Sequence, residues 1–139
     1  MHCRGRILAL DYGKRNVGMA YSDESGVTVQ PLPSLPNLGR RDLLQRLRAT
    51  IKLMGIRELV IGVPINMDGS SGESVRRMKR LMNNLRSELK LAISGVDERL
   101  STIEALEVWH GMSLRQKKKY RTVDSVAAAL ILERYLGES

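Results

Sequence analysis

The chain has 139 residues, enough for one hydrophobic core but too few for two full lobes. Its 42% hydrophobic and 27% charged residues are ordinary for a soluble globular protein, and no apolar run approaches the roughly 18 residues of a membrane span. One cysteine excludes an internal disulfide and, with two scattered histidines, a Cys/His zinc cage. The start of the chain shows no signal-peptide pattern, so a cytoplasmic location is expected.

The net charge of +8 and the isoelectric point near 10.1 favour a polyanionic partner. The positive excess is spread over both halves of the chain, so it belongs to the fold rather than to a tail. A basic surface that serves only solubility is the alternative. The absence of Phe, with one Trp and four Tyr, argues against a base-stacking platform, so we expect recognition of backbone and shape.

The N-terminal part is expected to form an antiparallel meander of three strands. Alternating and apolar residues bounded by turn clusters predict strands over residues 6–11, 17–22 and 27–29. Pro31, Pro33 and Pro36 are then expected to prevent regular structure until about residue 39.

From residue 40 onward, helical spacing alternates with continuous apolar runs. Helices are expected over 40–54, after residue 70, over 102–110 and from Thr122 onward, and strands over 58–63 and 91–97. Capping-box patterns begin at Ser70 and Ser101, and residues 115–121 are interpreted as a basic connector. The order β-β-β-α-β-α-β-α-α predicts a mixed five-stranded α/β sheet with helices on both faces.

Three acidic positions stand where such a sheet can bring carboxylates together. Asp11 ends the first strand, Asp97 and Glu98 end the last strand, and Asp124 opens the final helix. Carboxyl ends of strands line the ligand crevice of open α/β sheets, and carboxylates there, in a basic protein, suggest a divalent metal acting on a phosphodiester. Neighbours on a strand point to opposite faces, so only one of Asp97 and Glu98 can readily join Asp11. The structural alternatives are a turn-forming Asp11 and an Asp124 that only stabilises its helix.

Four segments carry a family resemblance: LALDYGKRNVGMAYSD (8–23), VIGVPINMDGSSGES (60–74), VDERLSTIEA (96–105) and VDSVAAALILERYL (123–136). In this order they resemble the RNase H-like superfamily, and within it the chain is similar to the YqgF family, also called RuvX, a relative of the RuvC resolvases. The resemblance implies one RNase H-like nuclease domain over residues 1–139. The expected sheet order is 3-2-1-4-5, with strand two antiparallel to its neighbours.

The family is regarded as a metal-dependent nuclease that processes the 5′ end of precursor 16S ribosomal RNA, with Holliday-junction resolution as an earlier assignment. The resemblance implies Asp11, Glu98 and Asp124 as catalytic residues and metal ligands, holding one or two Mg²⁺ or Mn²⁺ ions. It leaves Asp97 as a turn residue or a support for the site. The expected partner is structured nucleic acid, precursor rRNA ahead of a DNA junction, bound by a monomer or weak homodimer. A non-catalytic RNA-binding assembly factor is a further alternative.

Basic residues outside the acid positions are candidate contacts to nucleic-acid phosphate, with solvated surface as the alternative for each. These candidates are Lys14, Arg15, Arg76, Arg77, Arg80, Arg99, Lys117, Lys118 and Lys119. The loop before the second helix adds a candidate phosphate grip at Asn66, Gly69 and Ser70, although the same residues suit ordinary loop chemistry.

The segment from Asp11 to Gly18 also fits the phosphate-1 hairpin of actin-like ATPases and sugar kinases. Those folds need a second lobe and an adenosine-binding segment, for which 139 residues leave no room. Nucleotide binding is therefore the less favoured hypothesis.

Overall fold

The computed structural model describes residues 5–63, 72–97 and 101–138. Ten elements follow one another in these residues: β1 (Arg6–Tyr12), β2 (Asn16–Ser22), β3 (Val29–Pro36), α1 (Arg40–Met54), β4 (Ile56–Val63), α2 (Gly72–Leu89), β5 (Ala92–Asp97), α3 (Ser101–Gly111), α4 (Leu114–Tyr120) and α5 (Val123–Glu138). No helix in the described residues is both long and apolar enough to span a membrane.

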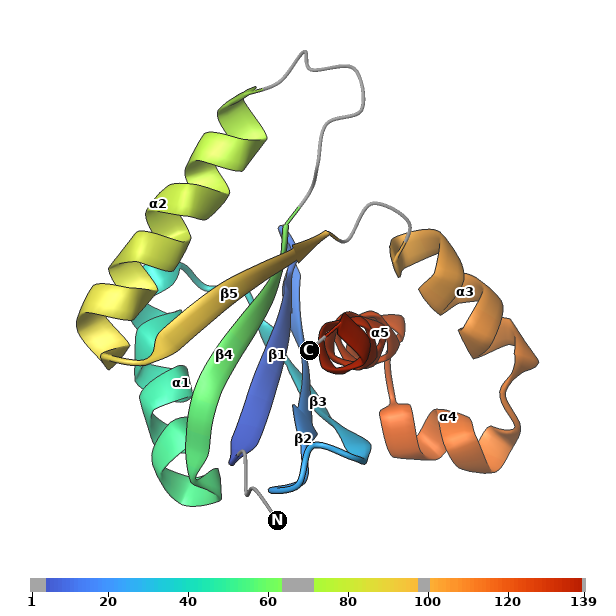
Figure 1. The fold of residues 1–139 in the computed structure, drawn as a ribbon. Helices are drawn as coiled ribbons and strands as arrows, with labels where there is room; N and C mark the ends of the chain where they lie inside the picture. Colours follow the sequence, from blue (N-terminus) through green and yellow to red (C-terminus); the bar gives the residue numbers. More distant parts are fainter. Residues whose placement is uncertain (1–4, 64–71, 98–100, 139) are drawn as a thin grey trace.

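The strands form one mixed sheet in the order β3-β2-β1-β4-β5. β2 runs antiparallel to β1 and to β3, whereas β1, β4 and β5 are parallel. The predicted strand order and directions are therefore confirmed. Helices α1 and α2 cover one face of the sheet, and α3, α4 and α5 lie on the other (Figure 1).

Alternate residues of β1 enter two different cores, as the two-residue period of a strand requires. Leu8 and Leu10 are fully buried in the cluster formed with α1 and α2. Ile7 and Ala9 are fully buried in the cluster formed with α5. The next two residues continue this alternation, so Asp11 belongs to the α5 side, and Tyr12 packs on the α1–α2 side.

The expectation that the prolines interrupt regular structure after residue 29 is wrong, because Pro31, Pro33 and Pro36 all lie within β3. Pro31 pairs with Ala20 of β2 and Pro36 pairs with Asn16. β3 is an edge strand with one neighbour, and an edge strand tolerates residues that lack a backbone N–H. The prolines also block further strand pairing on the open side of β3.

The expected basic connector over 115–121 is wrong as well, because most of it forms the helix α4. The helix starts with a capping box, in which Ser113 Oγ accepts from the backbone N–H of Gln116 at 3.2 Å. The Ser113 N–H in turn donates to Gln116 Oε1 at 3.2 Å. Ser-x-x-Gln is a sequence signature of a helix start, so the signal was present in the chain.

The predicted boundaries of the longer elements are confirmed to within a few residues. α1 ends at Gly55, whose left-handed backbone caps the helix, and β4 begins immediately at Ile56, two residues earlier than expected. The inward face of α2 carries four buried residues, Met78, Leu81, Met82 and Leu85. The expected capping box at Ser70 lies outside the described residues, as does the side chain of Ser101.

Candidate active site

Asp11 and Asp124 meet where the first turn of α5 crosses β2. The pairing of β1 with β2 puts Asp11 opposite Gly18. A Cβ atom on Gly18 would overlap the carbonyl oxygen of Asp124 and lie 3.0 Å from its Cβ. The missing side chain of Gly18 therefore lets α5 approach the sheet closely enough to bring Asp124 beside Asp11.

The two carboxylates interact electrostatically. Both are partly buried, and burial raises the pKa of the Asp124 carboxyl above its ordinary value. The nearby negative charge of Asp11 raises it further. Two carboxylates that repel each other in a partly dry site match the donor set of a hard divalent cation, which would neutralise both.

A group of hydroxyls fixes the start of α5 against β3. Ser125 is fully buried, and its Oγ donates to the carbonyl of Leu32 at 2.8 Å. Thr122 Oγ1 caps the helix by accepting from the Ser125 N–H at 3.2 Å. Ser34 Oγ lies 2.7 Å from Thr122 Oγ1 and 3.3 Å from Ser125 Oγ. This hydroxyl network of Ser34, Thr122 and Ser125 holds the helical turn that carries Asp124.

A second set of hydrogen bonds orders the turn between β1 and β2. The Gly13 N–H donates to the Asn16 carbonyl at 3.0 Å and closes the hairpin. Asn37, just beyond β3, donates from Nδ2 to the Gly13 carbonyl at 2.7 Å, and its N–H donates to the Arg15 carbonyl at 2.8 Å. The hairpin tip with Lys14 and Arg15 is thereby held directly after Asp11.

The third predicted acid, Glu98, lies outside the described residues, as do Arg99 and the loop residues Asn66, Gly69 and Ser70. Within the residues that the structure describes, no group of three or more His, Cys, Asp or Glu residues could hold a metal ion. The structure thus brings together two of the three predicted ligands, Asp11 and Asp124.

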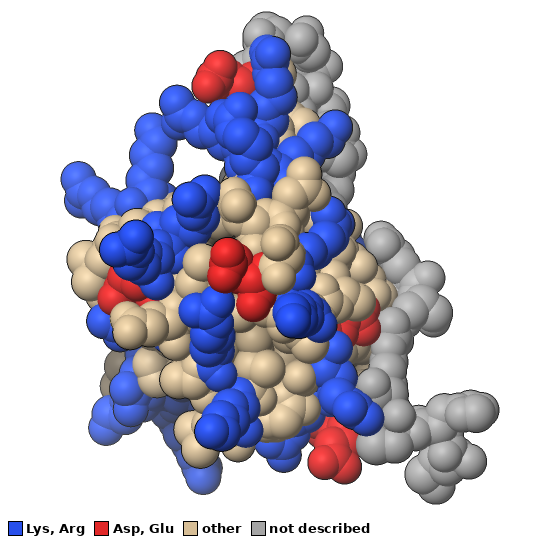
Figure 2. Space-filling view, turned by 90° about the vertical axis from the view of Figure 1, so that its left-hand side faces the viewer, with Lys and Arg blue, Asp and Glu red and all other residues tan. Residues whose placement is uncertain are grey.

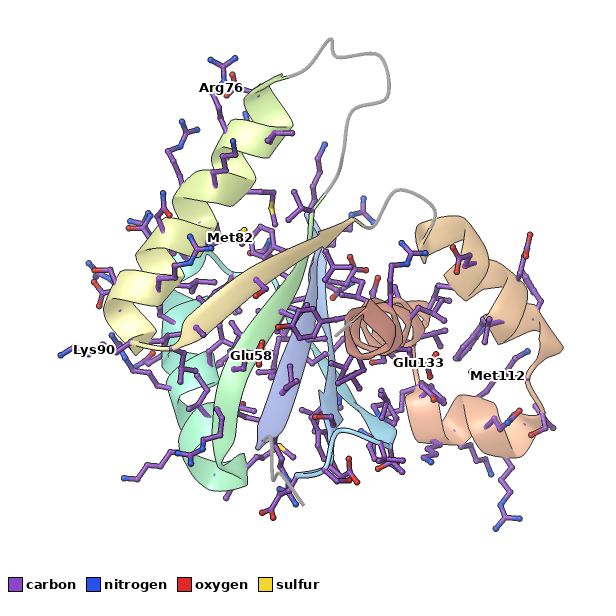
Figure 3. The ribbon with its side chains drawn as sticks, viewed as in Figure 1. Glu58, Arg76, Met82, Lys90, Met112 and Glu133 are labelled. Carbon is purple, nitrogen blue, oxygen red and sulfur yellow. The ribbon has the colours of Figure 1, made fainter. Side chains whose placement is uncertain are left out.

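The predicted basic contacts fall on opposite faces of the sheet. Arg76, Arg77 and Arg80 are exposed on α2, and Arg76 points away from the sheet whereas Met82 points toward it (Figure 3). Lys118 and Lys119 are exposed on α4, on the α5 side (Figure 1). Lys117 lies 5.5 Å from the centre of the Trp109 ring, a cation–π distance that joins α4 to α3.

Four contributors to this site were not predicted from the sequence: Gly18, Ser34, Asn37 and Ser125. An isolated glycine inside a strand is a signal of close backbone approach, so Gly18 could have been found. Ser34 and Asn37 carried no such signal, because the proline-rich segment was not expected to form a strand beside α5. Their roles depend on tertiary contacts between β3, the hairpin and α5.

A family model described as "RuvX: Holliday junction resolvase" matches residues 5–138. The chain belongs to the RuvX family. A RuvX relative from Koribacter versatilis, named "Putative pre-16S rRNA nuclease", is 37% identical over 132 residues, covering 95% of this chain and 86% of the relative. One of the same name from Geobacillus kaustophilus is 39% identical over 133 residues, covering 94% and 96%.

Solved structures share the fold of this RuvX chain. Thermus thermophilus RuvC in complex with a Holliday junction substrate superposes with a TM-score of 0.59 at 10% identity, covering 96% of this chain and 97% of RuvC. The fowlpox virus Holliday junction resolvase gives 0.58 at 11% identity, covering 96% and 99%. At such identities the likeness shows the fold alone, an RNase H-like mixed sheet flanked by helices.

Proposed function

We propose that this chain is a nuclease that hydrolyses phosphodiester bonds in structured nucleic acid, with the 5′ end of precursor 16S ribosomal RNA as its substrate. The observation that carries the proposal is the convergence of Asp11 and Asp124 at Gly18, in a chain with a net charge of +8. The names of the RuvX relatives support the choice of substrate.

We assign Asp11, Glu98 and Asp124 to hold Mg²⁺ or Mn²⁺, because carboxylate oxygens are the ligands that these ions prefer. A bound divalent ion supplies a Lewis acid that stabilises charge at the attacked phosphate and activates a water molecule at neutral pH. The chain's own contribution is positional. β1 fixes Asp11, and α5, held by the hydroxyl network, presents Asp124 without reorganisation during the reaction.

Substrate phosphates would be held by basic residues around the carboxylates. Lys14 and Arg15 are exposed on the hairpin directly after Asp11, so they would contact the strand nearest the cleaved bond. We assign the same kind of backbone contact to three further groups: Arg99 with the loop residues Asn66, Gly69 and Ser70; Arg76, Arg77 and Arg80 of α2; and Lys117, Lys118 and Lys119 of α4. Such contacts position the substrate without reading its sequence.

Resolution of DNA junctions is the second candidate, because the matching family model is described as a Holliday junction resolvase. A resolvase would favour a symmetric dimer with two active sites about a two-fold axis. The RNA reading predicts instead that one copy of the chain cleaves its substrate.

Wild type and Asp11→Asn should be compared on precursor 16S rRNA and on a four-way DNA junction, with Mg²⁺, with Mn²⁺ and with chelator. Cleavage of the RNA by wild type alone, and only with metal, is the expected result. Symmetric nicking of the junction in preference to the RNA would replace the substrate assignment with the resolvase. Metal-independent binding of RNA without cleavage would replace the nuclease with an assembly factor.

A further inference from the structure

The face formed by α1 and α2 is strongly basic and hollowed. Figure 2 shows Lys and Arg side chains spread over this face, with few Asp or Glu among them. A hollow of about 520 Å³ lies between the two helices. Its polar lining consists of Arg40, Arg41, Gln45 and Arg48 from α1 and Asn84 and Glu88 from α2. We call this hollow the α1–α2 groove.

The two acids near the α1–α2 groove, Asp42 and Glu88, pair with other arginines of α1 and leave the charges of Arg40 and Arg41 uncancelled. Glu88 accepts from Arg48 at 2.9 Å, and Asp42 pairs with Arg46 at 2.8 Å. Arg40 and Arg41 are exposed, and no ion pair involves either of them in the described part of the chain. Two adjacent guanidinium groups in this position form a surface for a polyanion.

A second hollow lies at the carboxyl edge of the sheet, beside the hairpin that follows Asp11. It measures about 380 Å³, and its lining includes Tyr12, Lys14, Asn37 and Arg77. Tyr12 directly follows Asp11, and Asn37 lies three residues before Arg40. Both hollows are lined by residues of α2: Arg77 and Leu81 line this one, and Asn84 and Glu88 line the α1–α2 groove. These four positions recur at the three- and four-residue spacing of a single helix face. The two hollows therefore form one path along α2.

This path lies on the opposite face of the sheet from the carboxylates, because Asp11 faces α5 and Tyr12 faces α1 and α2. A nucleic acid that reaches both the carboxylates and the path along α2 must cross the carboxyl edge of the sheet at the hairpin. A folded or branched substrate does this with two arms, one at the carboxylates and one in the groove. Among the described residues, the lining of the α1–α2 groove has amide side chains and arginines but no aromatic side chain, which suits a sugar–phosphate backbone rather than unstacked bases.

We propose that the α1–α2 groove binds the phosphate backbone of a substrate arm that flanks the cleaved bond, with Arg40 and Arg41 as its main contacts. This inference rests on the proposed function and deepens it, since it assigns a second subsite to the same substrate. It adds two arginines of α1, Arg40 and Arg41, to the phosphate contacts predicted from the sequence.

The test uses Arg40→Gln/Arg41→Gln and a control double variant, Lys52→Gln/Arg57→Gln. The control removes the same charge from exposed positions near the other end of α1. Arg40 and Arg41 lie in the first turn of α1, where positive charge opposes the helix dipole, so their loss should leave the fold intact. Thermal unfolding of both variants checks this point.

Binding is measured in the Asp11→Asn background with two RNA hairpins that carry the same cleavage region, one with a long flanking duplex and one with that duplex removed. For the long RNA, Arg40→Gln/Arg41→Gln should weaken binding about tenfold or more near 0.1 M salt. It should also lower the slope of log K against log salt by about 1.4 to 1.8. For the short RNA, the variant and the control should bind like their parent.

The groove proposal would be overturned if Arg40→Gln/Arg41→Gln lost the same affinity for both RNAs or none for the long RNA. It would also be overturned if the control variant lost as much affinity for the long RNA. Competition by polyglutamate as effective as that by duplex RNA would assign the groove to an acidic protein instead. The binding assay does not depend on cleavage, so failure of the groove and failure of the nuclease assignment are distinguishable. If wild type cleaves no RNA but the length preference depends on Arg40 and Arg41, the nuclease proposal fails and the groove stands.

Discussion

At the residue scale, two residues decide whether the carboxylates can share an ion: Asp124, which carries one of the charges, and Gly18, which leaves room for it. The charged form of Asp124 is unfavourable in the folded, metal-free protein, because burial and Asp11 both raise its pKa. Gly18 permits the approach of Asp124 to Asp11, because it has no side chain to overlap the backbone of Asp124. Asp124 therefore serves function at the expense of stability.

Asp124→Asn should stabilise the metal-free protein at neutral pH. The pKa of Asp124 is higher in the folded state than its ordinary value of 3.8, so its charged form opposes folding at every pH above that raised pKa. The penalty disappears as the pH falls through the raised pKa toward 3.8, and the advantage of the variant should disappear with it. Thermal unfolding from pH 7 to pH 3 in the presence of chelator measures the difference.

Mg²⁺ should reverse this order. A ligand at ten times its Kd stabilises the folded state by about 1.4 kcal/mol, so Mg²⁺ should raise the Tm of wild type but not that of Asp124→Asn. Asp42→Asn is the matched control, because it removes a surface carboxylate paired with Arg46 and should keep the full response to Mg²⁺. An equal Mg²⁺ response in wild type and Asp124→Asn would exclude Asp124 as a ligand.

Gly18→Ala should destabilise the protein by about 1–3 kcal/mol, because the added methyl group overlaps the backbone of Asp124 and forces α5 away from β2. Mg²⁺ affinity should fall with it, since Asp124 moves together with its helix. Gly137→Ala is the control: a Cβ at this position near the end of α5 meets no atom within 4 Å. Alanine there should be neutral or stabilising by up to about 1 kcal/mol. Unfolding and Mg²⁺ titrations of both variants test the contact.

At the element scale, α5 is docked by a polar contact as well as by its apolar face. Ala128 and Leu132 of this helix are fully buried against the sheet, which sets its distance. The hydroxyl network of Ser34, Thr122 and Ser125 ties its first turn to β3, which sets its position along the sheet. An edge strand therefore contributes to the site although it carries none of the predicted catalytic residues.

Ser125→Ala should destabilise the fold by about 1–3 kcal/mol, because it leaves the partly buried carbonyl of Leu32 in β3 without its donor. As a positioning effect, kcat should fall by up to about 100-fold while KM stays nearly constant. Ser87→Ala, an exposed serine of α2, should change neither stability by more than about 0.5 kcal/mol nor activity. If KM rises and kcat is kept, Ser125 contributes to binding rather than to the position of Asp124.

The sequence predicted most of the sheet because its elements carry clear patterns, such as the continuous apolar run of β4 and the helical spacing of α2. It also predicted the convergence of Asp11 and Asp124, since the end of β1 and the start of α5 were both recognisable. It predicted a third strand but placed it over residues 27–29, whereas β3 spans Val29–Pro36. The position was wrong because local propensity excludes prolines from strands and only the edge position of β3 permits them. The hydroxyl network was missed for the same reason, since Ser34 gains its partners only when β3 lies beside α5.

At the scale of the whole molecule, the sheet separates two surfaces with different tasks. The α5 side carries the carboxylates, and the α1–α2 side carries the groove with Arg40 and Arg41. The hairpin after Asp11 lies between them at the carboxyl edge. We expect a basic molecule of this design to bind a polyanion over a wide area and to confine the chemistry to the site of Asp11 and Asp124.

The most direct measurement is the single-turnover cleavage rate of precursor 16S rRNA by wild type, Asp11→Asn, Asp124→Asn and the double variant, at saturating Mg²⁺. Carboxylates that hold the same ion act as a unit, so each single variant should lose about 10³-fold or more, and the double variant should lose no more than the worse single one. Unchanged binding of the RNA by all four proteins would show that the losses are chemical. A single variant that cleaves at the wild-type rate, or losses that multiply in the double variant, would contradict a shared metal site at Asp11 and Asp124.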